Sequence, residues 1–284
     1  MEDEFDPTIF PPPQRTEPCK LYLIGPQEVG GAFPERLRAA LGGGEVAAFQ
    51  LRVKDMDAHE LARLAEPLQR ICADAGTAFI VNDSVSLAKR LGADGVHLGQ
   101  KDGDIRDARA VLGPSAQIGR TCHDSRHLAM EAGEAGADYV AFGSFYPTTT
   151  KPSDYRPHPA ILSWWASLFE IPCVAIGGIT PANAKPLVDA GADFIAVCQA
   201  VWGKEDTRAA VEAFGEKLPW TIVRPSIVYG PGEADMFASL TPSKSREADF
   251  QFTRSYFNNA YVLVTRDAQE APASLDEMTG RRLA

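Results

Sequence analysis

The sequence predicts an α/β protein built as a closed (β/α)8 barrel, with a C-terminal extension that is not part of the barrel. Short apolar runs alternate with amphipathic stretches from about residue 20 to about residue 218, in eight pairs. Parallel strands joined by helices in this number are typical of a TIM barrel. Gly-Ala-Asp also recurs at 92–94, 136–138 and 191–193, and each copy indicates a helix end, a tight turn and a buried strand. A doubly wound open sheet is the second choice.

Length and composition indicate a globular protein with a full core. The chain has 284 residues, of which 45% are hydrophobic and 23% charged, and its net charge is −10. Because Lys and Arg do not cluster, nucleic acid and anionic membranes are not expected as partners. No run reaches the roughly 18 apolar residues of a membrane span, and residues 1–6 are acidic where a secretory signal is basic. We therefore expect a cytoplasmic protein, and homo-oligomer formation stays open.

The five cysteines are scattered and show no CxxC spacing; they are Cys19, Cys72, Cys122, Cys173 and Cys198. This spacing argues against a zinc site and against a disulfide framework. We expect buried thiols.

The elements follow from local patterns. Residues 1–19 are expected to form a flexible arm, because three prolines and several acids leave too little apolar surface for folding. The predicted strands are 21–24, 46–49, 78–81, 95–97, 117–119, 139–141, 173–176 and 194–196. Helices are predicted at 33–41, 57–75, 84–91 and 125–135, and after a cap at Thr180 with Pro181 in the first turn. The helix 57–75 has a clear apolar stripe, ended by Gly76, that consists of Leu61, Leu64, Leu68, Ile71 and Cys72.

After the barrel region, 20–218, the alternation of strands and helices ends. The extension 219–284 has strand character at 220–229 and one further apolar run at 261–264. Residues 219–232 faintly resemble a fragment of the extended short-chain dehydrogenases and epimerases, but the glycine-rich dinucleotide fingerprint is absent. The role of this extension stays open.

Polar residues follow the second strand at the end where barrel active sites form. Gln50, Arg52 and Lys54 lie on one side of an extended backbone, because side chains alternate with period two. Two cations and an amide in this arrangement suit a diphosphate. A solvated edge paired with Asp55 or Asp57 is the alternative.

Two carboxylates follow neighbouring strands. Asn82 and Asp83 come after the third strand, and the fourth is followed by His97, Gly99, Gln100 and Asp102. Asp83 and Asp102, with amides beside them, suit Mg²⁺, which prefers oxygen ligands and bridges phosphate oxygens. Capping of the next helices is the competing interpretation.

The later strand ends add hydroxyls and exposed amides. Thr121 and His123 follow the fifth strand, and the stretch 142–151 places three threonines and Lys151 after the sixth. Gly177-Gly178 predicts a phosphate cradle near a helix N-terminus, with a packing role as the alternative. Cys198 and Gln199 follow the eighth strand. We therefore predict two anion sites, as a reaction between two phosphorylated small molecules requires.

Over about residues 20–217 the chain resembles the thiamine phosphate synthase family, whose barrels condense a pyrimidine diphosphate with a thiazole phosphate. The matching motifs are Gln50-Leu51-Arg52-Val53-Lys54, Asn82-Asp83, the run 92–100 with Asp102, Pro147-Thr148-Thr149-Thr150-Lys151, and Ala175-Ile176-Gly177-Gly178-Ile179. By this resemblance the pyrimidine diphosphate is held by Gln50, Leu51, Arg52, Val53, Lys54, Asn82, Thr121 and Lys151. The thiazole phosphate is held by Thr148, Thr149, Thr150, Gly178, Cys198 and Gln199.

The resemblance also implies a cofactor and a mechanism. Asp83 and Asp102 would bind Mg²⁺, and Lys151, Arg52 and Thr121 are the candidate catalytic residues. The metal and the cations stabilise the departing diphosphate, and the thiazole nitrogen then attacks the methylene carbon. No protein nucleophile is needed.

The chain departs from the family pattern at four positions. Thr121 and Gln199 replace serines, Ser144 replaces a proline, and Arg120 replaces a small apolar residue and adds a cation nearby. Two other functions stay open. One is a thiazole tautomerase-like isomerase with His123 as the base, and the other is a non-catalytic barrel that binds a thiamine precursor. The complete diphosphate and metal apparatus favours the synthase.

Overall fold

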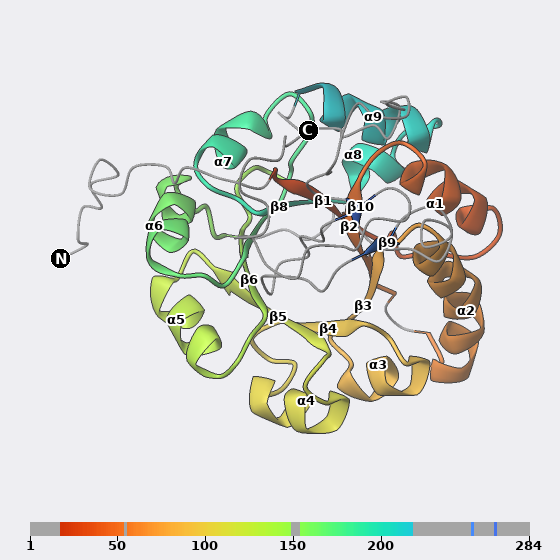
Figure 1. Ribbon diagram of the computed structural model, residues 1–284, viewed down its shortest axis with the longest axis horizontal. Coiled ribbons are helices and arrows are strands. Elements are labelled where there is room, and N and C mark those ends of the chain that lie inside the picture. Colours follow the sequence, from red (N-terminus) through yellow and green to blue (C-terminus); the bar gives the residue numbers. More distant parts are fainter. Residues whose placement is uncertain (1–17, 54–55, 149–153, 218–250, 253–263, 266–284) are drawn as a thin grey trace. The chain divides into compact units, whose positions relative to one another are not determined.

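The computed structural model describes residues 18–53, 56–148, 154–217, 251–252 and 264–265. The chain divides into two compact units, Met1–Ile222 and Val223–Ala284. In the first unit eight parallel strands pair in chain order, and β8 pairs with β1 to close a barrel. Helices surround the barrel as a ring (Figure 1). The predicted (β/α)8 barrel is confirmed, and the open doubly wound sheet is excluded.

The strands lie close to their predicted positions. They are β1 Lys20–Ile24, β2 Val46–Leu51, β3 Ala78–Asn82, β4 Gly95–Leu98, β5 Gln117–His123, β6 Tyr139–Gly143, β7 Cys173–Ile176 and β8 Phe194–Val197. The chief difference is β5, which continues to His123 instead of ending at Gly119. Thr121 therefore lies within this strand and not after it.

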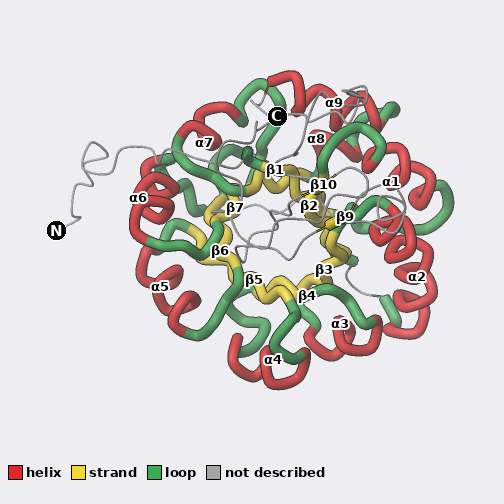
Figure 2. Tube along the Cα trace, in the orientation of Figure 1, coloured by secondary structure: helices red, strands yellow, loops and turns green. Residues whose placement is uncertain are grey.

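The helices on the outside of the barrel begin with α1 and end with α9 (Figure 2). They are α1 Phe33–Leu41, α2 Ala58–Asp74, α3 Val85–Leu91, α4 Ile105–Leu112, α5 Arg126–Glu134, α6 Ala160–Leu168, α7 Lys185–Asp189, α8 Gln199–Trp202 and α9 Thr207–Lys217. The predicted stripe on α2 is buried or packs against the core. No helix in the described ranges is long and apolar enough to cross a membrane.

The start of α7 differs from the prediction. The helix begins at Lys185, its N-cap residue is Ala184, and the proline in its first turn is Pro186. Thr180 is not the cap. Its amide donates to the side-chain oxygen of Asn183 at 2.7 Å, and the amide of Asn183 donates to its carbonyl at 3.1 Å. This local turn takes up the backbone groups that a helix would use, so the helix starts later.

The second unit contains a short antiparallel pair among its described residues. β9, Gln251–Phe252, pairs with β10, Val264–Thr265. The end of the predicted apolar run 261–264 thus belongs to a strand. The predicted strand at 220–229 and the arm up to residue 17 lie outside the described residues, so the domain boundaries at 19 and 218 stay predictions.

The three Gly-Ala-Asp copies clamp strand pairs together at the N-terminal end of the barrel. Each aspartate accepts a bond from an amide of the preceding strand: Phe79 to Asp94 at 2.7 Å, Ile118 to Asp138 at 2.6 Å, and Cys173 to Asp193 at 2.7 Å. Each aspartate amide also donates back to the carbonyl of that same residue, at 3.0, 2.8 and 3.0 Å. The clamps therefore join β3 to β4, β5 to β6, and β7 to β8.

The core has two layers. The larger layer lies between strands and helices, and a smaller cluster fills the barrel interior with residues such as Tyr22, Ile80 and Tyr139. Four of the five cysteines are buried and Cys198 is partly exposed. Burial raises the pKa of Cys72 and Cys122 to about 12, which keeps these thiols protonated and inert. The predicted buried thiols are thus confirmed except at Cys198.

Gly119 makes room for a tyrosine in the barrel interior. A Cβ atom here would lie 1.9 Å from Cζ of Tyr139. We therefore expect Gly119→Ala to lower the free energy of unfolding by about 1–3 kcal/mol or more, because the ring cannot move within a filled interior. Urea unfolding measures this loss. Gly30→Ala is the control, since its nearest neighbour would be Leu64 at 3.9 Å. An equal effect of both substitutions would contradict the explanation.

Candidate active site

The end of β2 carries the first predicted phosphate-binding group. Gln50 is only 4% exposed, and its Nε2 donates to the phenol oxygen of Tyr22 at 2.9 Å. Arg52 and Val53 continue past the strand and are partly exposed. Asp57, one proposed partner for these cations, caps α2 by accepting bonds from the amides of His59 and Glu60. Lys54 lies outside the described residues.

The two predicted metal ligands are not helix caps. Ser84 caps α3, where its hydroxyl accepts a bond from the amide of Leu87 at 3.2 Å. Asp104 caps α4 and accepts from the amides of Arg106 and Asp107. The capping interpretation of Asp83 and Asp102 is therefore wrong.

Both carboxylate residues are anchored to the end of β4. Asp83 has a left-handed backbone, with φ +63°, and its amide donates to the carbonyl of His97 at 2.8 Å. The Oδ2 atom of Asp102 accepts a bond from the amide of Gly99 at 3.0 Å. A Cβ atom on Gly99 would lie 2.6 Å from this oxygen, so any larger residue there would displace the carboxylate of Asp102. The anchor points are two residues apart, which spans at most about 7 Å.

This pair of residues fits a magnesium ion. Mg²⁺ is commonly held by one or two carboxylates together with substrate phosphates and water. In the described ranges, no group of three or more His, Cys, Asp or Glu side chains could hold a metal by itself. Two carboxylates at neighbouring strand ends match the mode in which a substrate completes the coordination.

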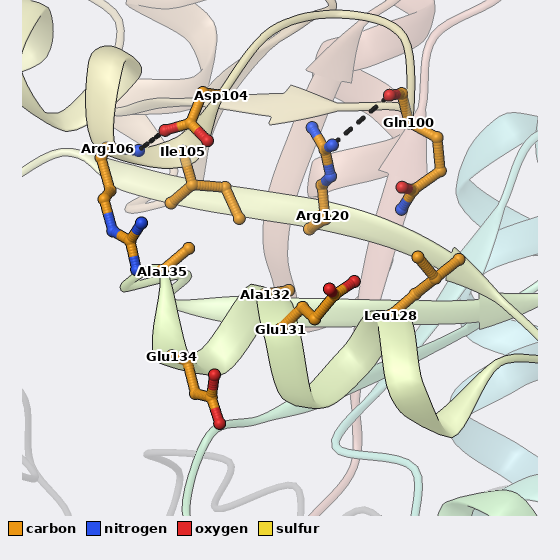
Figure 3. Close-up of a pocket in the computed structure, with 10 residues that line it drawn as sticks. All are labelled: Gln100, Asp104, Ile105, Arg106, Arg120, Leu128, Glu131, Ala132, Glu134 and Ala135. Carbon is orange, nitrogen blue, oxygen red and sulfur yellow. Dashed lines mark hydrogen bonds between the residues drawn. The ribbon is translucent and has the colours of Figure 1, made fainter.

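Arg120 points away from the barrel interior. Its guanidinium donates to the carbonyls of Gly103 at 2.8 Å and Gln100 at 3.5 Å, and it borders a cavity of about 320 Å³ between α4 and α5 (Figure 3). The Gln100 side chain in turn donates to the carbonyl of Thr121. Arg120 therefore holds the loop that carries Asp102, and the prediction that it adds a cation near the strand-end site is wrong.

The loops after β6 and β7 are bonded to each other. The amide of Tyr146 donates to the carbonyl of Gly177 at 3.0 Å, and a Cβ atom on Gly178 would lie 2.4 Å from the carbonyl of Pro147. The packing role of these glycines is thus real, and it places Thr148 beside Gly178. Thr149, Thr150 and Lys151 lie outside the described residues.

The backbone at Gly178 still suits an anion, although no helix begins there. Helix α7 starts only at Lys185, so the predicted position near a helix N-terminus is wrong. Among the described residues, however, no acceptor takes a hydrogen bond from the amide of Gly178. A backbone amide in this position can bind a phosphate oxygen.

The end of β8 is open to solvent. Cys198 is partly exposed, and its thiol lies 3.9 Å from the carbonyl of Gly25. Gln199 is exposed, and a Cβ atom on Gly203 would lie 3.3 Å from its Oε1. The longer amide therefore extends over α8 and does not fill the mouth of the barrel.

His123 ends β5 after an irregularity in the ladder. Its backbone is left-handed, with φ +56°, and the register with β6 shifts between Thr121 and His123. The imidazole stacks on the ring of Tyr155, with centroids 4.1 Å apart and an interplanar angle of 21°.

Five side chains form a hydrogen-bonded line across the barrel interior, which we call the lumen chain: Gln50, Tyr22, Tyr139, His97 and Thr121. The two phenol oxygens are 2.9 Å apart. His97 Nδ1 lies 3.1 Å from the phenol of Tyr139, and its Nε2 lies 2.8 Å from the hydroxyl of Thr121. Tyr22 and Tyr139 are not among the residues predicted for the site. For Tyr139 a usable signal is its place opposite a strand glycine, Gly119; Tyr22 pairs with Ala48 and Ala196 and has no such signal.

We expect the two buried phenols, Tyr22 and Tyr139, to make the protein less stable in alkali. Burial raises the pKa of Tyr22 to about 12 and that of Tyr139 well above its ordinary value of 10.0. The folded state therefore favours neutral phenols, and their stabilising contribution is complete below pH 10 and lost as the pH rises towards 12. Urea unfolding should show that the free energy of unfolding falls between about pH 9 and about pH 11, and that this fall is smaller in Tyr22→Phe than in the wild type. The same fall in both proteins would contradict the assignment.

Carboxylates, amides and hydroxyls gathered at the C-terminal strand ends of a closed barrel define the chain as a (β/α)8 enzyme. The protein-family model described as Thiamine monophosphate synthase matches residues 21–201, and the chain belongs to that family.

Similar proteins carry consistent names. The chain is 63% identical over 205 residues to a thiamine-phosphate synthase of Erythrobacter litoralis, covering 71% of this chain and 96% of that protein. It is 52% identical over 196 residues to a thiamine-phosphate synthase of Rhodospirillum centenum, covering 69% and 95%. The solved structure of thiamine phosphate pyrophosphorylase from Pyrococcus furiosus has a TM-score of 0.63 and 35% identity, and covers 70% of this chain and 94% of that chain.

Proposed function

We propose that the chain is a thiamine phosphate synthase, a transferase that joins hydroxymethylpyrimidine diphosphate to thiazole phosphate and releases diphosphate. The observation that carries this proposal is the pair Asp83 and Asp102, held at neighbouring strand ends without capping a helix. A tautomerase has no diphosphate to expel and does not need such a pair. The names of relatives 52% to 63% identical support the same reaction.

Asp83 and Asp102 are the residues that would hold Mg²⁺ in this reaction. When bound, the ion neutralises charge on the departing diphosphate. Arg52, together with Lys54 and Lys151 by family resemblance, supports the same charge as the bond between the methylene carbon and the diphosphate oxygen breaks. The thiazole nitrogen then forms the new bond to that carbon. His123 has no required role, because no protein nucleophile takes part.

The second substrate would bind at the ends of β6 to β8. The amide of Gly178 and the hydroxyl of Thr148 are the described donors for the thiazole phosphate, and Thr149 and Thr150 join them by resemblance. Cys198 and Gln199 would line the same subsite. We expect the barrel 20–218 to carry all these groups, to act on small molecules and to work in the cytoplasm.

The proposal is tested by incubating the purified chain with both substrates and Mg²⁺. We expect thiamine phosphate and diphosphate to form in equal amounts. Interconversion of thiazole tautomers without diphosphate release would establish the isomerase instead, and substrate binding without turnover would establish the non-catalytic barrel.

Arg120 provides a prediction that concerns the metal alone. Arg120→Met removes the bonds to the carbonyls of Gly103 and Gln100 and so loosens the loop that presents Asp102. We expect the Mg²⁺ concentration at half-maximal rate to rise about three- to tenfold, with kcat at saturating Mg²⁺ little changed. Arg106→Met is the control, because Arg106 borders the same cavity (Figure 3). A lower kcat with unchanged Mg²⁺ dependence would assign Arg120 another role.

A further inference from the structure

The lumen chain joins two substrate-binding positions that lie far apart in the sequence and on different strands. Gln50 stands at its β2 end and Thr121 at its β5 end, while Tyr22, Tyr139 and His97 link them through the interior. The three linking residues are 4%, 7% and 8% exposed. Buried polar groups of this kind are almost always fully hydrogen-bonded. Each proton in the line must therefore have an acceptor.

With the amide of Gln50 oriented as it is in the structure, the direction of the line follows from this first member. The amide nitrogen of Gln50 can only donate, so the oxygen of Tyr22 accepts from it. Tyr22 then has one proton to give, and within the described residues the phenol of Tyr139 is its acceptor. Tyr139 must then donate its own hydrogen bond to Nδ1 of His97. This leaves Nδ1 unprotonated and puts the imidazole proton on Nε2, which donates to Thr121.

Only one other arrangement satisfies every member of the line. If the amide of Gln50 were rotated by 180°, its oxygen would accept from Tyr22, and each later bond would reverse. His97 would then carry its proton on Nδ1, and Thr121 would donate to Nε2. The hydrogen-bonding roles of Gln50 and Thr121 towards a ligand are therefore coupled: if one end changes from acceptor to donor, the other changes from donor to acceptor.

We propose that Tyr22, Tyr139 and His97 are positioning residues that fix Gln50 to offer its carbonyl oxygen, and Thr121 to offer its hydroxyl proton, at the mouth of the barrel. This pattern selects a heteroaromatic ring with an amino group that donates to Gln50 and a ring nitrogen that accepts from Thr121. An aminopyrimidine has both. The identity of the ring rests on the proposed function, whereas the proton arrangement does not.

The experiment reads the tautomer of His97 in the full chain labelled with ¹⁵N-histidine. Long-range ¹H–¹⁵N correlation separates the two tautomers, and His97→Asn identifies the His97 signals. We expect the Nε2–H form alone in the wild type and a mixture of both forms in Tyr139→Phe, because this substitution removes the central oxygen. Tyr155→Phe also removes one phenol oxygen but stands outside the lumen chain, and it should leave His97 unchanged.

Kinetics supply the second measurement. In Tyr139→Phe the KM for the pyrimidine diphosphate should rise about tenfold, while the KM for the thiazole phosphate stays the same. Tyr22→Phe interrupts the same line and serves if Tyr139→Phe does not fold. The Nδ1–H form in the wild type, an unchanged tautomer in the folded variant, or an equal rise in both KM values would each overturn the proposal. A wild type with the Nε2–H form but without synthase turnover would overturn the proposed function and support the proton arrangement.

Discussion

Asp102→Asn should lower turnover about a hundredfold or more at saturating substrates. The substitution removes half of the carboxylate pair that we propose as the Mg²⁺ site, and metal neutralisation of a leaving diphosphate contributes several kcal/mol to the transition state. Asparagine keeps the shape and still offers an oxygen to the amide of Gly99, so the fold should be intact. Steady-state rates across a Mg²⁺ series, with unfolding curves alongside, measure the effect.

Two variants separate metal binding from loop structure. Asp104→Asn lies in the same loop and keeps a good capping residue on α4, so it should retain nearly full activity. Gly99→Ala keeps the carboxylate of Asp102 but places a methyl group where its oxygen lies, and it should raise the Mg²⁺ requirement. A fully active Asp102→Asn, or an equal loss in Asp104→Asn, would remove the metal role from Asp102.

Among alanine substitutions of the three clamp aspartates at the N-terminal end of the barrel, Asp138→Ala should be the most destabilising. Its carboxylate accepts from the amide of Ile118 and pairs with Arg109, and both side chains of this pair are less than a third exposed, at 26% and 30%. Losing a charged acceptor while leaving a partly buried guanidinium behind costs about 2–3 kcal/mol. Urea unfolding measures the change.

The activity of Asp138→Ala at low temperature should be close to that of the wild type, because the clamps lie opposite the active site. Asp107→Ala, in the first turn of α4, is the matched control and should change stability by less than about 0.5 kcal/mol. If the two substitutions had equal effects, the repeated Gly-Ala-Asp would be a turn sequence without a clamping role.

The parts of this protein that could be predicted from sequence are those specified by neighbouring residues. The alternation of short apolar runs with amphipathic stretches predicted the barrel. The apolar stripe of α2 predicted a helix that ends just before Gly76, whose φ is +67°. Strand-end positions such as Asp83 and Asp102 follow from the barrel alone, because all C-terminal strand ends meet at one mouth.

The parts that could not be predicted depend on which side chains meet in space. Ser84 and Asp104 take the capping positions for which Asp83 and Asp102 also qualify by sequence. Arg120 faces outward because β5 continues past Gly119, so Arg120 belongs to the strand and follows its alternation of inward and outward side chains. The lumen chain depends on contacts between residues up to 117 positions apart, such as Tyr22 and Tyr139, which a local pattern does not reveal.

The clamps also bear on the order in which the barrel assembles. Each one joins residues 15 or 20 positions apart, so its loop closes at a small entropic cost before the rest of the chain is in place. The last seam, between β8 and β1, joins residues such as Asp193 and Lys20 that are almost the whole barrel sequence apart. We expect β3–β4, β5–β6 and β7–β8 to form as separate early units, and ring closure to limit the folding rate.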